Sequence, residues 1–123
     1  MSIWDDPEMR VNSDFVKFEV VGDTITGDIL HVKAHRFDDN SVAPQILLNA
    51  VSGQFASIDN GQLVWTRVEP DVERTLTAGQ IRLKAALADQ RPEAGDRITV
   101  TLTQIEKRSG GKTLKHFDVT VIR

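Results

Sequence analysis

Cysteine and tyrosine are both absent from the 123-residue chain, and only 6% of its residues are aromatic. Without cysteine the chain has no disulfide framework, no thiolate zinc site and no cysteine nucleophile, so packing alone must stabilise it. No apolar run approaches the roughly 18 residues that a membrane-spanning helix needs. With 40% apolar and 27% charged residues, the composition predicts one soluble globular domain with no membrane partner.

Motifs that carry catalysis are absent as well. There is no Ser-His-Asp spacing, no glycine-rich phosphate loop ahead of a helix and no glycine-framed carboxylate pair. The residues nearest to a metal-ligand set are His31, His35, Asp38 and Asp39. Two histidines four apart on a strand share a face, but they lack the closeness that a helix would give them. We therefore expect a non-enzymatic protein with no cofactor and no metal.

The charges are unevenly distributed along the chain. The net charge of −3 argues against a surface devoted entirely to phosphate, because cations supply most of the affinity for nucleic acid. Acids dominate the first 14 residues, whereas bases dominate residues 107–123, so a local basic patch is predicted. The N-terminal residues have neither the positive flank nor the apolar core of a secretory signal, and we expect a cytoplasmic protein.

Residues 96–123 carry the clearest pattern, that of a β-hairpin. Apolar residues alternate with polar ones in two runs, at Ile98, Val100 and Leu102 and again at Phe117, Val119 and Val121. A period of two with one apolar face is what a half-buried strand needs. Residues 107–112 join the runs through two glycines, which supply the positive backbone angles of a tight connection. The sequence thus predicts a rigid pair of strands that presents a basic loop to solvent.

Three further strands are predicted upstream of the hairpin. Residues 15–34 form one long, strongly curved strand, which Gly27 interrupts with a bulge or a bend. Residues 44–51 form a short apolar strand that Pro44 can begin, and residues 61–68 form the third strand. Residues 51–60 and 69–75 are predicted to be loops. Residues 1–13 are predicted to be a flexible arm ahead of the domain at 14–123, with Trp4 folded back on the core or on a neighbouring copy.

One helix is predicted between these strands and the hairpin. Thr77 and Gln80 have the spacing of a capping box, so the helix should begin at Ala78. Pro92 should end it. The order of elements is therefore three strands, one helix and two strands.

A mainly β chain of five curved strands with one α-helix between strands 3 and 4 resembles the OB-fold, a small Greek-key barrel. The resemblance rests on the glycine-interrupted first strand, Gly22-Asp-Thr-Ile-Thr-Gly-Asp-Ile-Leu, and the glycine-led fourth, Gly95-Asp-Arg-Ile-Thr-Val-Thr-Leu. Over residues 14–123 the order of elements is similar to that of small single-stranded DNA-binding proteins of tailed bacteriophages. This resemblance implies sequence-independent binding of single-stranded DNA in replication or recombination, in the cytoplasm of a bacterial host.

The resemblance also implies where the DNA would bind. In an OB-fold the loops after strands one and four flank the groove, and strands two and three form its floor. Residues 33–43 and 107–112 would then wall a groove in which cations meet phosphates and rings stack on bases, each stack worth roughly 1–3 kcal/mol. The predicted binding residues are Lys33, His35, Arg36, Phe37, Trp65, Arg67, Lys107, Arg108, Lys112 and Lys115. With so few aromatics we expect weak binding or several copies acting together, and replication or recombination proteins as further partners.

Other interpretations fit the same residues. Trp65 lies in phase with Leu63 and Arg67 and suits a core as well as a groove, and the cations of the hairpin tip suit solubility alone. The alternative function is a protein-interaction or assembly module that binds through Trp4, one stripe of the helix and exposed strand edges. The DNA interpretation requires the two basic loops to lie on one side of the molecule, with no helix filling the space between them.

Overall fold

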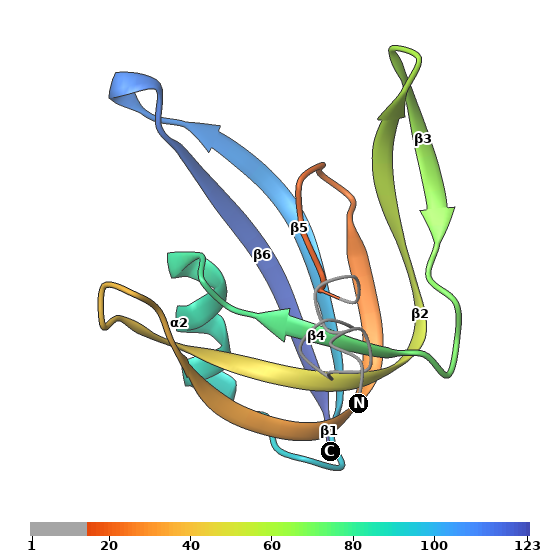
Figure 1. The fold of residues 1–123 in the computed structure, drawn as a ribbon, viewed down its shortest axis with the longest axis vertical. Helices are drawn as coiled ribbons and strands as arrows, with labels where there is room; N and C mark the ends of the chain where they lie inside the picture. Colours follow the sequence, from red (N-terminus) through yellow and green to blue (C-terminus); the bar gives the residue numbers. More distant parts are fainter. Residues whose placement is uncertain (1–14) are drawn as a thin grey trace, which may run out of the picture.

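The computed structural model describes residues 15–123, and these form one sheet and one α-helix (Figure 1). The strands are β1 (Thr24–Arg36), β2 (Val42–Asp59), β3 (Gln62–Arg67), β4 (Glu73–Thr77), β5 (Arg97–Lys107) and β6 (Thr113–Ile122), and the helix is α2 (Ile81–Gln90). The mainly β prediction is therefore confirmed. The predicted arm at residues 1–13 and its Trp4 lie outside the described residues. Within those residues, no helix is both long and apolar enough to cross a membrane.

The sheet has six strands in place of the expected five, and it does not close into the expected barrel. Its order is β3-β2-β1-β5-β6, and β4 pairs with β2 beside this path. The additional strand, β4, lies partly in a segment that the sequence predicted to be a loop. Leu76 of β4 is fully buried opposite Ile46 of β2, and this burial offsets the polar composition of the rest of the strand. The helix consequently follows the fourth strand, where the sequence placed it after the third.

β1 begins later than predicted because a buried carboxylate turns the chain ahead of it. Asp23 is 1% exposed. Its Oδ2 atom accepts hydrogen bonds from the N–H groups of Glu19 and Val20 at 2.9 and 3.0 Å, and its Oδ1 atom accepts one from Ala56 at 2.9 Å. Residues 19–23 therefore form a turn fastened to β2, and the segment before it pairs with Thr75 of β4 through Phe15 and Val16. The bulge predicted at Gly27 is confirmed, since the pairing of β1 with β2 shifts register there.

β2 is much longer than predicted, with 18 residues, and it includes the predicted loop at 51–60. Its first half pairs with β4 and its second half with β3. Gly53 lies at the junction with φ 151°, and a Cβ added there would lie 2.4 Å from the carbonyl oxygen of Thr24. Because only glycine fits this approach, β2 can bend away from the core and continue into a free hairpin with β3.

The hydrophobic core lies inside the curve of the sheet and is closed by α2. The predicted inward residues of the C-terminal hairpin are confirmed, with Ile98, Val100 and Leu102 all fully buried. From α2, Leu83 and Leu87 are buried in the same core. The other main members of the core are Phe18, Ile25, Ile29, Ile46, Leu48, Ala50, Leu76, Ala78 and Val119.

The helix begins three residues later than its predicted start. The N–H of Ala78 donates to the carbonyl of Pro44 at 2.9 Å, so this residue continues the pairing of β4 with β2. Gln80 is the N-cap, and no side chain caps the helix. The capping box predicted at Thr77 is therefore wrong, because the Thr77 hydroxyl is engaged by Gln45 Nε2 at 2.9 Å.

Candidate nucleic-acid interface

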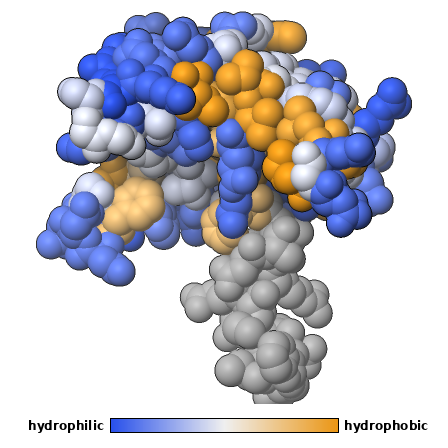
Figure 2. Space-filling view, turned by 90° about the horizontal axis from the view of Figure 1, so that it is seen from above, coloured by the Kyte–Doolittle hydropathy of each residue, from blue (hydrophilic) through white to orange (hydrophobic). Residues whose placement is uncertain are grey.

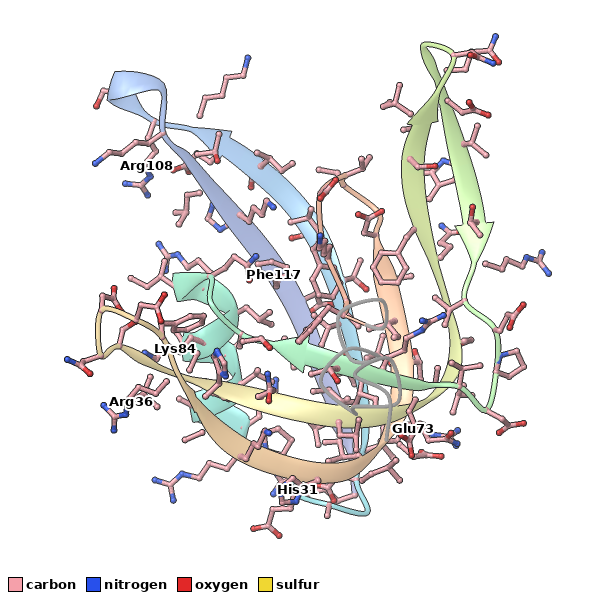
Figure 3. The ribbon with its side chains drawn as sticks, in the orientation of Figure 1. His31, Arg36, Glu73, Lys84, Arg108 and Phe117 are labelled. Carbon is pink, nitrogen blue, oxygen red and sulfur yellow. The ribbon has the colours of Figure 1, made fainter. Side chains whose placement is uncertain are left out.

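The two predicted loops lie on the same side of the molecule, but α2 lies between them. Figure 3 shows Arg36 from the β1–β2 end, Lys84 from α2 and Arg108 from the β5–β6 tip along one side of the ribbon. Glu73 lies on the other side in the same view. The prediction of a groove between the loops with β2 and β3 as its floor is therefore wrong, because the helix occupies the space between the loops.

The first cleft on this side, which we call the hairpin cleft, lies between α2 and the tip of β5–β6. Its apolar lining comes from Ile81, Ala85 and Leu114. Its cations are Arg82, Arg108 and Lys112, and Thr113 completes the lining. No carboxylate lines this cleft, so an anion entering it meets positive charge from both walls.

The second cleft, which we call the β1–β2 cleft, lies between the other side of α2 and the end of the β1–β2 hairpin. Lys33 and Lys84 supply its cations. The rest of the lining is apolar and consists of Val32, Ala34, Val42, Ala43 and Pro44. This cleft also has no acidic lining residue. The two clefts share α2, which contributes one cation to each.

Three acids lie near the clefts and set their local charge. Glu106 pairs with Arg108 at 2.9 Å, which leaves part of the guanidinium available, because a guanidinium carries five N–H donors. In the β1–β2 connection, Asp39 accepts hydrogen bonds from the Oγ and the N–H of Ser41 at 2.6 and 2.9 Å. The Ser41 hydroxyl, and then its N–H, hold the pKa of Asp39 below its usual value. The neighbouring Asp38 is exposed, so this connection carries negative charge beside the cations.

The predicted residues Trp65 and Arg67 do not join the loops. They lie on β3, whose Trp65 pairs with Ala56 near the far end of β2. Roughly 46 Å of strand, measured along the chain at about 3.3 Å per residue, separates Ala56 from Val42 at the start of β2. The Trp65 ring is 41% exposed and packs over Gly22, with its Cη2 atom 3.0 Å from where a Cβ would stand. Trp65 is thus neither a core residue nor part of a groove between the loops.

The predicted residues of the first loop divide between two faces. Lys33 and His35 lie opposite Gln45 and Ala43 of β2 and share one face of the strand, whereas Arg36 lies on the other. The ring of His35 meets that of Phe37 edge to face, with centroids 4.8 Å apart. Phe37 is exposed, as predicted, at the edge of the sheet, and its ring reaches Gly79 just ahead of α2.

The predicted residues of the hairpin also divide. Lys107, Arg108 and Lys112 are exposed at the tip, as the sequence predicted. Lys115 is not, because its Nζ donates to the carbonyl of Phe18 at 2.5 Å. This bond fastens β6 to the segment before β1, so Lys115 contributes to the fold rather than to a free basic surface.

Sequence reasoning missed the two cations of α2, Arg82 and Lys84. In the sequence they stand on either side of Leu83, as polar residues between the apolar positions of an ordinary amphipathic helix. Only the packing of α2 between the two hairpins brings them beside the basic loops. Within residues 15–123, no group of three or more His, Asp or Glu side chains could hold a metal ion. No protein-family model matches the chain, and no curated protein or solved structure shows significant similarity to it.

Proposed function

We propose that the protein is a non-enzymatic single-stranded DNA-binding protein, and that the strand lies across α2 from one cleft to the other. The observation that carries this proposal is a row of cations from three segments far apart in the sequence, around two clefts with no acidic lining. The cations that line the clefts are Lys33, Arg82, Lys84, Arg108 and Lys112, and Arg36 and Lys107 are exposed near the ends of the same two hairpins.

The chemistry of the clefts favours a single strand over a duplex. Phosphates are attracted by the cations of the rims, and base and sugar faces can cover the apolar floors. A duplex stacks its bases inside and presents mainly phosphate and sugar, so the apolar floors would gain nothing from it. Phe37, exposed beside the start of α2, is the one predicted aromatic near the clefts, and it offers a stacking surface. With a single platform, we expect modest affinity per molecule.

The arrangement of strands supports an open relative of the OB-fold. The long β1 is central and pairs with both β2 and β5, and the helix directly precedes β5. Glycine-assisted bends in β1 and β2 give the sheet its curl. A role in protecting or organising strands during replication or recombination, in the cytoplasm of a bacterial host, follows from the likeness to bacteriophage proteins and forms part of the same proposal.

A binding titration tests this function directly. Fluorescence anisotropy of a labelled oligothymidine should show binding at low salt that weakens steeply as salt rises. The log–log slope should be about −0.7 per phosphate contacted. A duplex of the same length should compete poorly. Absence of binding to the single strand at low salt, or tighter binding of the duplex, would contradict the proposal.

The second candidate is a protein-interaction module, and a different observation favours it. The β2–β3 hairpin exposes large apolar side chains, with Ile58 at 68% and Leu63 at 47%. A surface of this kind serves association between proteins, and it carries no cluster of cations. If the titration detected no DNA binding, the protein-interaction module would become the favoured function.

A further inference from the structure

Phe55 packs against the core and the N–H of Ala56 bonds to Asp23, but beyond these two residues the β2–β3 hairpin extends away from the core as an arm. In Figure 1 it rises on one side of the molecule, and the β5–β6 hairpin rises on the other. Within the described residues β3 pairs only with β2, so its second edge has no partner. Figure 2, which looks onto the hairpin tips, shows hydrophobic residues in orange over the half of the molecule where this arm stands. Its exposed apolar side chains are Ile58, Leu63, Val64 and Trp65.

Few contacts within one copy of the chain stabilise such an arm. A two-stranded ribbon is marginally stable in water, and an unpaired edge is a template for another strand. The usual protections of an edge strand are missing from β3 (Gln62–Arg67): it has no proline, no lysine and no bulge. We propose that β3 pairs antiparallel with β3 of a second copy of this chain, around a two-fold axis that passes between Val64 and Val64 of that copy.

The hydrogen-bond pattern of the hairpin permits this pairing. Asn60 and Gly61 both have positive φ, 51° and 78°, as in a type I′ turn, which makes Asp59 and Gln62 a hydrogen-bonded pair. Two residues further along, Val64 then directs its own N–H and C=O toward β2. Leu63 and Trp65 direct theirs to the free edge, where the same groups of a second copy can meet them.

The side chains are self-complementary in this register. A two-fold axis normal to the sheet keeps the same face of both copies on the same side, so opposite residues must share a face. Centring on Val64 places it against Val64 of the second copy, and it places Leu63 against Trp65 of the second copy. Ile58 lies beside Leu63, and Ala56 lies beside Trp65. The face that carries Leu63 and Trp65 would therefore hold two unbroken apolar rows, each with four side chains.

The one charged residue of β3 does not oppose a second copy in this register. Arg67 comes to lie opposite Gly61 of the second copy, and no like charges face each other across the edge. Centring on Trp65 instead would place Leu63 opposite Arg67 and break the apolar rows. Because one short strand edge is a small interface, association should be concentration-dependent, with a dissociation constant on the order of micromolar. The arm lies at the opposite end of β2 from the β1–β2 cleft, and the β5–β6 hairpin rises on the other side of the molecule (Figure 1), so both clefts would stay accessible.

The absence of cysteine from the chain allows a direct test with the full-length protein. In Val64→Cys, the two thiols would lie across a non-hydrogen-bonded pair with Cα atoms about 4.5 Å apart, within reach of a disulfide. Gln62→Cys is the matched control on the same face of β3, with its Cα atoms about 13 Å apart along the strands. Mild oxidation should crosslink Val64→Cys and leave Gln62→Cys as monomer.

Sedimentation velocity of the unmodified chain over a range of concentrations completes the test. A reversible dimer that Val64→Lys weakens about tenfold or more supports the proposal, because lysines would then face each other across the axis. A chain that stays monomeric would overturn it. So would a dimer that Val64→Lys leaves intact, or one that crosslinks equally through Gln62→Cys. DNA binding is measured separately and can fail without affecting this result.

Discussion

The ion pair between Asp28 and Arg97 shows how single charges are used away from the clefts. Arg97 Nε donates to Asp28 Oδ1 at 2.8 Å and Arg97 Nη2 donates to Oδ2 at 3.2 Å, on the exposed outer face of β1 and β5. Both carboxylate oxygens are thus engaged by one guanidinium. The pair ties two neighbouring strands at the end of the sheet where Thr26 and Thr99 also join their hydroxyls at 2.7 Å.

This pair gives a pH prediction. The hydrogen bonds from Arg97 hold the pKa of Asp28 below its ordinary 3.8. A carboxyl with a lowered pKa in the folded state stabilises the fold fully above 3.8, and that contribution is lost as pH falls through the lower value. Arg97→Gln should therefore raise the pKa of Asp28 toward 3.8, measured by NMR titration of its carboxyl carbon. The stability difference between the two proteins should vanish in acid; a difference that grows below pH 3 would contradict this account.

At the scale of elements, the bend of β2 decides the shape of the molecule. Gly53 is the position where the strand leaves the core, and its Cα faces the backbone of β1 at Thr24 and Ile25. Gly61, in the turn at the tip of the same hairpin, also has a positive φ but has no atom within 4 Å of an added Cβ. Both glycines have a positive φ, but only at Gly53 would an added Cβ also meet other atoms. Comparing the two positions therefore distinguishes the cost of steric overlap from the cost of the backbone conformation.

We expect Gly53→Ala to lower the free energy of unfolding by about 3 kcal/mol, because the methyl group would overlap rigid backbone. Gly61→Ala should cost only about 1 kcal/mol, the penalty of a left-handed conformation in open space. Urea denaturation monitored by circular dichroism measures both values. Equal losses in the two variants would show that the contact with Thr24 does not hold the bend.

The elements that the sequence predicted well are those where a single pattern dominates. The alternation runs from Ile98 to Leu102 in β5, ahead of a bulge, and from Phe117 to Val121 in β6, and both strands formed where expected. Residues 51–60 were assigned to a loop because Gly53 interrupts the pattern and because β2 is exposed on both faces from Ser57 to Asp59, with Phe55 and Ala56 only half-buried before it. A segment that is exposed on both faces has no alternation to detect. The helix was predicted, but its start depended on whether Ala78 would pair with Pro44, which is a tertiary contact.

The sequence predicted the two basic loops but not that α2 lies between them. Lys33 and Lys112 were assigned to loops on one side, and the structure places both beside α2. Trp65 was predicted to lie between them because the resemblance to the OB-fold implied a closed barrel. In an open sheet the far end of β2 carries Trp65 away from the loops, and α2 fills the place left for a β floor. The second condition set from the sequence for DNA binding, that no helix fills the space between the loops, is therefore not met. The DNA-binding proposal now depends on a different path, which runs over the helix.

The path over α2 is tested most directly by comparing the salt dependence of oligothymidine binding in two triple variants. One replaces Arg82, Arg108 and Lys112 of the hairpin cleft with alanine. The matched control removes the same net charge elsewhere, at three exposed cations that line neither cleft, in Lys17→Ala, Arg67→Ala and Arg91→Ala. The account predicts that the cleft variant binds more weakly and that its log–log slope flattens by about 2, at 0.7 per lost phosphate contact, while the control keeps the wild-type slope. An unchanged slope in the cleft variant, or an equal loss in the control, would contradict it.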